Sequence, residues 1–239
     1  MIKGWWWKLL GVLILVFVII YGFLGPVPNL PVLNESIRNL FFHVPMWMAM
    51  MFMLLVSLVS SILYLANSNN EVGNELSNGI TKKMKYDIMA SQWANVGLFY
   101  GFLGIITGSI WARTTWSAWW VFSEVKLNAA AAGILVYLAY FILRGAIEDE
   151  EQKARVSAVY NIFAFVMYMV LINVIPRIVE ASLHPGNGGN PGFSKYDLDS
   201  SLRVVFYPAV IGWTLLAAWM VDLKIRLKKI ELKKLNQFK

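Results

Sequence analysis

Two histidines, His43 and His184, are the side chains in this chain best suited to bind a metal ion or to exchange a proton near neutral pH. They are the only histidines among 239 residues, and the chain contains no cysteine. The lack of cysteine excludes disulfide bonds, thiolate metal ligands and attachment of a cofactor through sulfur. Either histidine alone is equally consistent with a hydrogen bond to a backbone carbonyl group. Their chemistry therefore depends on whether the fold brings them to one place.

Four tryptophans lie within ten positions of the segment TGSIWARTTWSAWWVFSEVKLN, residues 107–128. Tryptophans gather at the headgroup level of membrane proteins, where the indole ring is half in lipid and half in water. They also offer a flat apolar surface with N–H donors at its edge, which suits the face of a planar ligand. The residue types are consistent with both interpretations. The four residues are Trp111, Trp116, Trp119 and Trp120.

The elements that must position these side chains are membrane-spanning helices. The chain is 58% hydrophobic and 15% charged, whereas soluble domains carry roughly 25% charged residues. A helix needs about 20 apolar residues to cross a bilayer, and no stretch shows the alternation of a membrane β-strand. The sequence predicts an all-α membrane protein, a single domain over residues 1–239 that forms a bundle of six transmembrane helices. The predicted helices cover residues 5–24, 44–66, 88–112, 127–143, 156–176 and 204–223.

The distribution of positive charge predicts how the bundle is oriented. When loops alternate across the membrane, fifteen of the 21 Lys and Arg residues fall on the side of the termini and six on the other side. Cytoplasmic loops carry the excess of Lys and Arg, so both termini are expected in the cytoplasm. His43, the Trp-rich loop 112–126 and the loop 177–203, which contains His184, then lie at the outer face of the cytoplasmic membrane. The net charge of +7 reflects this topology and contact with membrane lipid, and no nucleic-acid partner is expected.

Two histidines on non-adjacent segments of the same face suit the two axial ligands of a planar macrocycle. Imidazole is a common protein ligand of haem iron. A zinc site would require three or four nitrogen, sulfur or oxygen ligands, and the chain has no further His or Cys to supply them. We therefore expect a non-covalently and transiently bound haem b, with His43 and His184 as iron ligands. The propionates of such a ligand would pair with the cations of the same face, Arg38, Arg113 and Lys126.

Three motifs carry a resemblance to a known family. The Trp-rich segment 107–128 resembles the "WWD" signature of the haem-handling proteins of cytochrome c maturation. RNLFFHVPMWMA resembles the Arg-x4-His-Val-Pro block of the CcmC branch of that superfamily, and SLHPG resembles its second-histidine loop. The resemblance covers essentially the whole chain. It implies that His43 and His184 are axial ligands, that Trp116, Trp119 and Trp120 are the signature tryptophans, and that Arg38 is the arginine before the first histidine.

The signature departs from the family pattern after the paired tryptophans. The family has Trp-Asp-x-Arg-Leu-Thr, whereas this chain has VFSEVKLN. With one extra residue allowed, Glu124 takes the acidic position and Lys126 the basic position. These substitutions keep the charges but not the geometry, because lysine cannot make the bidentate contact of arginine.

The resemblance also implies a function and partners. Proteins of the CcmC type hold haem at the outer face of the cytoplasmic membrane and load it onto the haem chaperone CcmE. They work beside the ATP-binding-cassette transporter CcmA–CcmB and the small subunit CcmD. The corresponding expectation for this chain is a haem-delivery protein without enzymatic activity, surrounded by partners of these types.

Three other function classes remain as alternatives. A cytochrome c synthase of the CcsA type shares the Trp signature, but it is expected to have additional histidines inside its helices, and this chain has none to spare. A b-type electron-transfer subunit would place its ligands deeper in the membrane. A permease without a cofactor would leave the histidines and the Trp-rich segment unexplained.

The third predicted helix contains a row of glycines at positions 97, 101, 104 and 108. Their spacing of three or four residues leaves one helical face without side chains, so that another backbone can approach closely. Helix packing is the simpler interpretation. A smooth wall beside the ligand is the alternative, and it applies best to Gly108, which is close to the Trp-rich segment.

Overall fold

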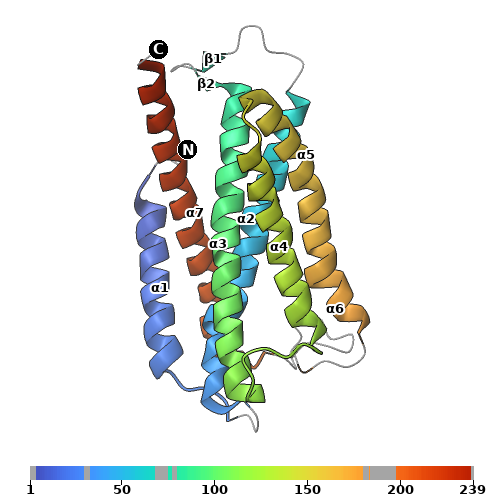
Figure 1. Cartoon of the computed structure of the whole chain (residues 1–239). Helices are drawn as coiled ribbons and strands as arrows, with labels where there is room; N and C mark the ends of the chain where they lie inside the picture. The colour runs from blue at the N-terminus through green and yellow to red at the C-terminus, as the bar shows by residue number, and fades with distance from the viewer. Residues whose placement is uncertain are drawn as a thin grey trace.

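The computed structural model of the chain describes residues 4–29, 33–67, 75–76, 80–179, 183 and 198–237. Six of its helices are long and apolar enough to cross a membrane, which confirms the predicted all-α bundle of six spans. Figure 1 shows these helices running side by side along one axis. The elements are α1 (Trp6–Leu24), η1 (Asn34–Asn39), α2 (Leu40–Ala66), β1 (Glu75–Leu76), β2 (Ile80–Thr81), α3 (Lys82–Trp116), α4 (Val125–Ala146), α5 (Glu150–Met169), η2 (Val170–Val174), α6 (Ile175–Ile178) and α7 (Ser200–Gln237).

The two ends of the bundle differ in what they carry. The antiparallel pair β1–β2, the start of α1 and the end of α7 lie toward the upper end in Figure 1. The start of α2, the end of α3, the start of α4 and α6 lie toward the lower end, which we call the His43 end. The end of α3 and the starts of α2 and α4 therefore lie at the same end of the bundle, because successive spans run in opposite directions.

The helices are longer than predicted, and the Trp-rich loop is correspondingly shorter. The second helix begins at Leu40 rather than at residue 44, and α3 continues to Trp116. The hydroxyls of Thr114 and Thr115 bond to the carbonyl of Trp111, which keeps this polar last turn helical outside an apolar environment. Ser117 then ends α3 in the left-handed conformation, with φ of 58°. The predicted loop 112–126 is therefore only the segment 117–124.

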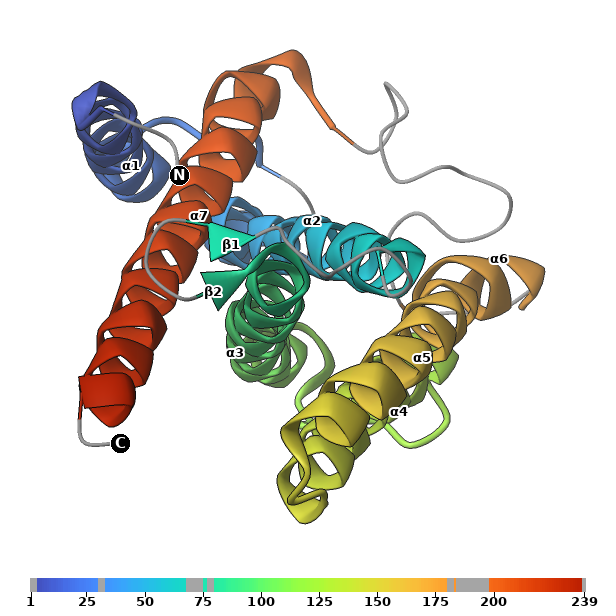
Figure 2. The same ribbon diagram turned by 90° about the horizontal axis from the view of Figure 1, so that it is seen from above.

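The central contact of the bundle is between α2 and α3, and the glycine row makes it close. A Cβ atom built on Gly97 would lie 2.9 Å from Leu54, and one on Gly101 would lie 2.6 Å from the sulfur of Met50. The helix-packing interpretation is thus confirmed for Gly97 and Gly101, whereas Gly104 and Gly108 also line the cavity described below. Figure 2 shows α2 and α3 in the middle, with α4, α5 and α6 on one side and α7 and α1 on the other.

Proline at position 45 creates a polar link between α2 and α7. Pro45 lies inside α2 rather than in a first turn, and it has no N–H to donate to the carbonyl of Phe41, four residues earlier. The indole N–H of Trp213 in α7 donates to that carbonyl at 3.2 Å. The backbone group freed by the proline is therefore satisfied inside the bundle, as an apolar environment demands.

A second proline alters the fifth span, which consists of α5, η2 and α6, near the His43 end. Pro176 cannot donate to the carbonyl of Ile172, and its ring would clash with that carbonyl in a regular α-helix. The helix widens to the π conformation over η2, directly before the proline, and continues as α6. Such single π turns are a recognised solution to a break in the helical ladder. Ile172, whose side chain lines the cavity described below, lies within this wider turn.

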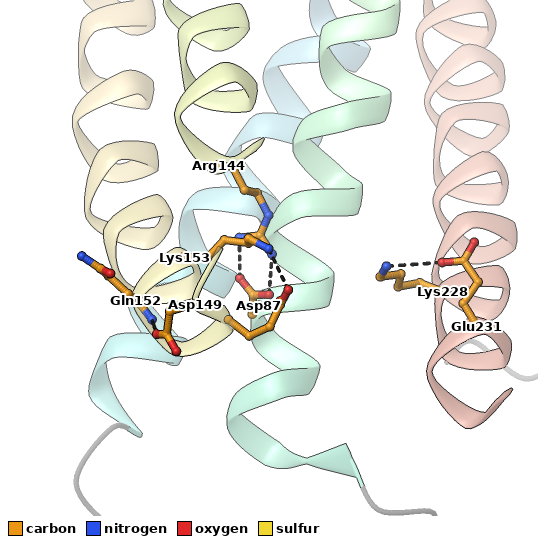
Figure 3. Close-up of polar contacts among 8 residues, drawn as sticks. Asp87, Arg144, Asp149, Gln152, Lys153, Lys228 and Glu231 are labelled. Carbon is orange, nitrogen blue, oxygen red and sulfur yellow. Dashed lines mark hydrogen bonds and ion pairs between the residues drawn. The ribbon is translucent and has the colours of Figure 1, made fainter. Parts of the chain in front are cut away.

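An ion pair joins α3 and α4 at the end opposite His43. The guanidinium of Arg144 donates to both carboxylate oxygens of Asp87, at 2.7 and 2.6 Å. Both side chains are largely buried, with 17% and 16% of their surface exposed. Figure 3 shows this pair between the helices, whereas Lys153–Glu150 and Lys228–Glu231 each join residues of one helix.

Removal of one partner of the Asp87–Arg144 pair should destabilise the bundle. Asp87→Ala leaves a guanidinium without its carboxylate in a partly buried place, which should cost roughly 3 kcal/mol of unfolding free energy. The double variant Asp87→Ala with Arg144→Ala should lose less than the sum of the two single losses. Reversible unfolding in detergent micelles measures both quantities, with Glu150→Ala, whose glutamate is 84% exposed, as the control. Additive losses would show that the pair is not coupled.

Candidate functional site

His43 lies in the second turn of α2 with its ring packed against α3. The side chain is 7% exposed. Its Nδ1 lies 3.1 Å from the carbonyl oxygen of Gly104 and 3.2 Å from the hydroxyl of Thr107. The rings of Trp47 and Trp111 face its edges at centroid distances of 6.5 and 5.9 Å, both in T-shaped geometry. The imidazole is therefore held in one orientation by contacts on several sides.

The helical segment before His43 is itself fixed to α3. The amide of Asn39 donates to the carbonyl of Thr107 at 2.9 Å. The indole N–H of Trp111 donates to the hydroxyl of Ser36 at 3.2 Å. These two bonds join η1 to the last turns of α3. They place the first turns of α2 in a defined register against the residues that surround His43.

A cavity of about 270 Å³ opens beside His43 between α2, α3, α4, η2, α6 and α7. Most of its described lining is apolar, and Lys126 contributes a positive charge. One face of α2 supplies residues at positions 43, 44, 47, 48 and 51, which spans just over two helical turns. The described lining residues are Leu40, His43, Val44, Trp47, Met48, Met51, Gly104, Ile105, Gly108, Ser109, Trp111, Trp120, Lys126, Leu127, Ala130, Ile172, Pro176, Leu198 and Phe206.

The structure brings three of the residues predicted for the site to this cavity, namely His43, Trp120 and Lys126. The described lining does not include Arg38, Arg113, Trp116, Trp119 or Glu124. Trp116 is the last residue of α3, and Trp119 is 60% exposed in the following loop. Of the three signature tryptophans, Trp120 belongs to the described lining of the cavity.

Arg38 and Arg113 make hydrogen bonds to helix ends. The guanidinium of Arg38 donates to the carbonyls of Gly22 and Gly25 at 2.9 and 2.8 Å, and it also pairs with Glu35 at 2.6 Å. It thereby satisfies carbonyls at the end of α1, where helical partners are missing. The guanidinium of Arg113 donates to the carbonyl of Ser117 and satisfies the end of α3 in the same way. Both cations also suit the negative end of a helix dipole.

Glu124 is buried at the start of α4, with 4% of its surface exposed. Its Oε2 accepts the backbone N–H of Leu183 at 2.9 Å. Leu183 is the residue before His184 in the chain, so this bond links the Trp-rich segment to the start of the second-histidine motif. His184 and most of the predicted loop 177–203 lie outside the described residues.

Asn128 holds the loop that presents Trp120. Its amide oxygen accepts the indole N–H of Trp120 at 3.2 Å, and its amide nitrogen donates to the carbonyl of Phe122 at 2.6 Å. Sequence reasoning placed Asn128 only as the end of a motif and assigned it no role. Trp47, Met48 and Met51 were also missed, although their spacing from His43 by four, five and eight residues places them on one helical face.

The donor set of the cavity fits a planar metal complex better than a bare metal ion. Among the residues that the structure describes, no group of three or more His, Cys, Asp and Glu side chains is placed to hold a metal. An imidazole beside an apolar cavity suits a metal complex in which most of the atoms that bind the metal belong to the complex itself. The lysine at the rim adds an attachment point for an anionic group.

Comparison with known proteins decides the family. Residues 7–184, about three quarters of the chain, match the Cytochrome C assembly protein family. The chain belongs to this family. The matched part contains His43, the glycine row, the Trp-rich segment and all of the described lining residues of the cavity except Leu198 and Phe206.

Several members of the Cytochrome C assembly protein family are distant relatives of the chain. Heme exporter protein C of Escherichia coli (strain K12) is 23% identical over 152 residues, which cover 62% of this chain and 58% of that protein. Heme exporter protein C of Paracoccus denitrificans (strain Pd 1222) is 24% identical over 168 residues, 70% of this chain and 62% of that protein. Cytochrome c biogenesis protein CcsA of Prochlorococcus marinus (strain NATL1A) is 25% identical over 116 residues, 48% of this chain and 36% of that protein. The chain thus spans less than two thirds of the length of these relatives.

A methyl group on Gly108 should disturb the site. A Cβ atom there would lie 2.7 Å from Cε1 of His43, so the ring or the helix must shift in Gly108→Ala. We expect a loss of roughly 1–3 kcal/mol in unfolding free energy, the usual cost of overpacking. Gly145→Ala is the matched control, because no atom lies within 4 Å of a Cβ built there. Equal unfolding free energies of the two variants would contradict the close contact of His43 with α3.

Proposed function

We propose that this member of the cytochrome c assembly family binds haem b at the outer face of the cytoplasmic membrane and delivers it to a haem chaperone of the CcmE type. The observation that carries the proposal is the buried His43, held between Trp47 and Trp111 at the side of an apolar cavity with a lysine at its rim. The names of the relatives, heme exporter protein C, point to the same ligand.

In this proposal the residues divide into those that touch the ligand and those that position others. His43 and His184 would hold the haem through its iron, and the haem would supply the metal that they bind. Trp120 packs against the apolar face, and Lys126 pairs with a propionate at the rim. Arg38 and Arg113 fix the ends of α1 and α3, and Glu124 holds the chain next to His184. Trp116 and Trp119 flank the mouth of the site.

The size of the cavity is consistent with partial enclosure of the ligand. Its volume of about 270 Å³ is just below the range of roughly 300–1,000 Å³ that is typical of small-molecule pockets. We propose that one edge of the macrocycle stays accessible at the mouth, beside the exposed Trp119 and Phe122. Accessibility of an edge suits a protein that hands its ligand to a partner, and no enzymatic step is required of it.

The proposed partners follow from the family context. A CcmE-like chaperone would receive haem at the His43 end, and a CcmA–CcmB transporter with a CcmD-like subunit would lie beside the bundle in the membrane. A cytochrome c synthase of the CcsA type is the second candidate, because the chain also matches CcsA over 48% of its length. The count of two histidines favours delivery, since a synthase is expected to hold haem at further histidines within its helices.

Haem binding and its ligands can be tested by absorption spectroscopy of the purified protein. The wild-type chain should show a low-spin spectrum with two histidine ligands. His43→Ala and His184→Ala should each lose that spectrum, and added imidazole should partly restore it by filling the vacant position. Trp120→Ala should keep both ligands but bind haem roughly 30-fold to 150-fold more weakly, because burial of a large ring against the ligand contributes about 2–3 kcal/mol.

Trp119→Ala is the matched control for Trp120, since Trp119 is exposed and outside the described lining of the cavity. It should bind haem with nearly wild-type affinity. A low-spin bis-histidine spectrum that survives in His43→Ala or His184→Ala would refute the assignment of the ligands, because the chain has no third histidine.

The orientation of the bundle can be tested by cysteine labelling, which the cysteine-free chain makes simple. Ser123 lies exposed in the loop before α4, and Glu148 lies exposed between α4 and α5 at the opposite end. Ser123→Cys should react with a membrane-impermeant maleimide in intact cells. Glu148→Cys should react only after permeabilisation. The reverse pattern would place the site in the cytoplasm and remove the proposed route to an outer chaperone.

A further inference from the structure

The contacts of the imidazole of His43 determine which of its two nitrogens carries the proton. The carbonyl oxygen of Gly104, 3.1 Å from Nδ1, can only accept a hydrogen bond. If the lone pair of Nδ1 faced this oxygen, two acceptors would oppose one another inside a buried site. The proton of the neutral ring therefore belongs on Nδ1, and the lone pair belongs on Nε2.

Thr107 provides a second acceptor for the same proton. Its hydroxyl donates to the carbonyl of Leu103 at 2.8 Å, and the carbonyl of Gly104 lies 3.2 Å away. With its own proton directed at the helix backbone, the hydroxyl oxygen offers a lone pair to Nδ1 of His43, 3.2 Å away. The N–H of the imidazole of His43 is thus shared by the carbonyl oxygen of Gly104 and the hydroxyl oxygen of Thr107, which lie three residues apart on α3.

The surroundings leave the ring little freedom to escape this arrangement. A methyl group on Gly108 would lie 2.7 Å from the ring, so α3 packs tightly against its edge. Trp47 and Trp111 approach it in T-shaped geometry from two further directions. The backbone carbonyl of Thr107 also accepts from Asn39 at 2.9 Å, so the residue is fixed through its main chain as well as its side chain.

We propose that Thr107, together with the carbonyl of Gly104, holds His43 as the Nδ1–H tautomer and directs the lone pair of Nε2 for ligand binding. Thr107 is thus a positioning residue, which acts through His43. The inference deepens the proposed function and rests on it only for the identity of the ligand. A ligating histidine is commonly oriented and made more electron-rich by an acceptor at its other nitrogen. In this chain the hydroxyl of Thr107 is the side-chain acceptor at the other nitrogen of His43.

The position of the proton can be measured without any ligand. The chain has two histidines, so ¹⁵N-labelled histidine gives two sets of ring resonances. In the His184→Ala variant only the resonances of His43 remain. The spectra are recorded at a pH of about 8.5, two units above the reference value of a free imidazole side chain. The wild-type ring should show a protonated Nδ1 and an unprotonated Nε2. A ring protonated on Nε2 would overturn the proposal without any variant at Thr107.

Variants of Thr107 test the contribution of its hydroxyl. Thr107→Val keeps the shape and removes the acceptor, which should lower the ratio of the Nδ1–H to the Nε2–H tautomer roughly fivefold, the effect of one ordinary hydrogen bond. Thr107→Ser should restore the wild-type ratio. Thr115→Val is the matched control, because the hydroxyl of Thr115 likewise donates to a carbonyl of its own helix, that of Trp111, but lies outside the described contacts of His43. A wild-type ratio in Thr107→Val would refute the role of the hydroxyl.

Haem-loaded protein provides a second readout in the otherwise unaltered chain. Loss of the acceptor should weaken ferric haem relative to ferrous haem and raise the midpoint potential of Thr107→Val above that of Thr107→Ser. A tenfold change in the ratio of the two affinities corresponds to about 59 mV for a one-electron couple. Equal potentials in the two variants would also count against the proposal. If the wild-type chain does not bind haem, the proposed function fails, while the tautomer measured in the ligand-free protein still decides the role of Thr107.

Discussion

The close approach of α2 and α3 is the constraint on which the site depends. Two helices can approach so closely only where one of them lacks side chains, and the glycine row supplies that surface over three turns. The same row that receives Leu54 and Met50 in the middle of the bundle receives Trp47 and His43 nearer its end. Packing and ligand presentation are therefore one structural feature here. The ring of His43 is oriented by the same helix that stabilises the bundle.

Some polar side chains within the bundle make hydrogen bonds from one helix to another. Asn161 of α5 donates to the hydroxyls of Ser57 and Ser61 of α2, and Ser57 donates to the carbonyl of Ala90 in α3. Each of these bonds joins helices in a region where water is excluded, so breaking one leaves a polar group in an apolar environment. Such bonds link α2 to both α3 and α5.

The hydropathy of the chain was sufficient to predict six helices, since each apolar segment is long enough to span a bilayer. The helix ends were less predictable, because polar residues such as Thr114 and Thr115 continue a helix by bonding to its own carbonyls. His43, Trp120 and Lys126 could be named from residue type and motif, and the structure brings them to one cavity. The contacts of Arg38 with Gly22 and Gly25 could not, because they depend on how the end of α1 meets η1. The same holds for Asn128, whose two bonds require the folded loop.

The bond between Trp213 and the carbonyl of Phe41 has a consequence for how the two ends of the bundle are connected. The helix that contains Trp213, α7, has 38 residues and is therefore about 57 Å long, nearly twice the thickness of the hydrocarbon layer of about 30 Å. Its C-terminal part, residues 224–234, is basic and continuous with the part that contains Trp213. The carbonyl that Pro45 leaves without a helical donor thus ties α2, two residues before His43, to a helix that continues to the opposite end of the bundle.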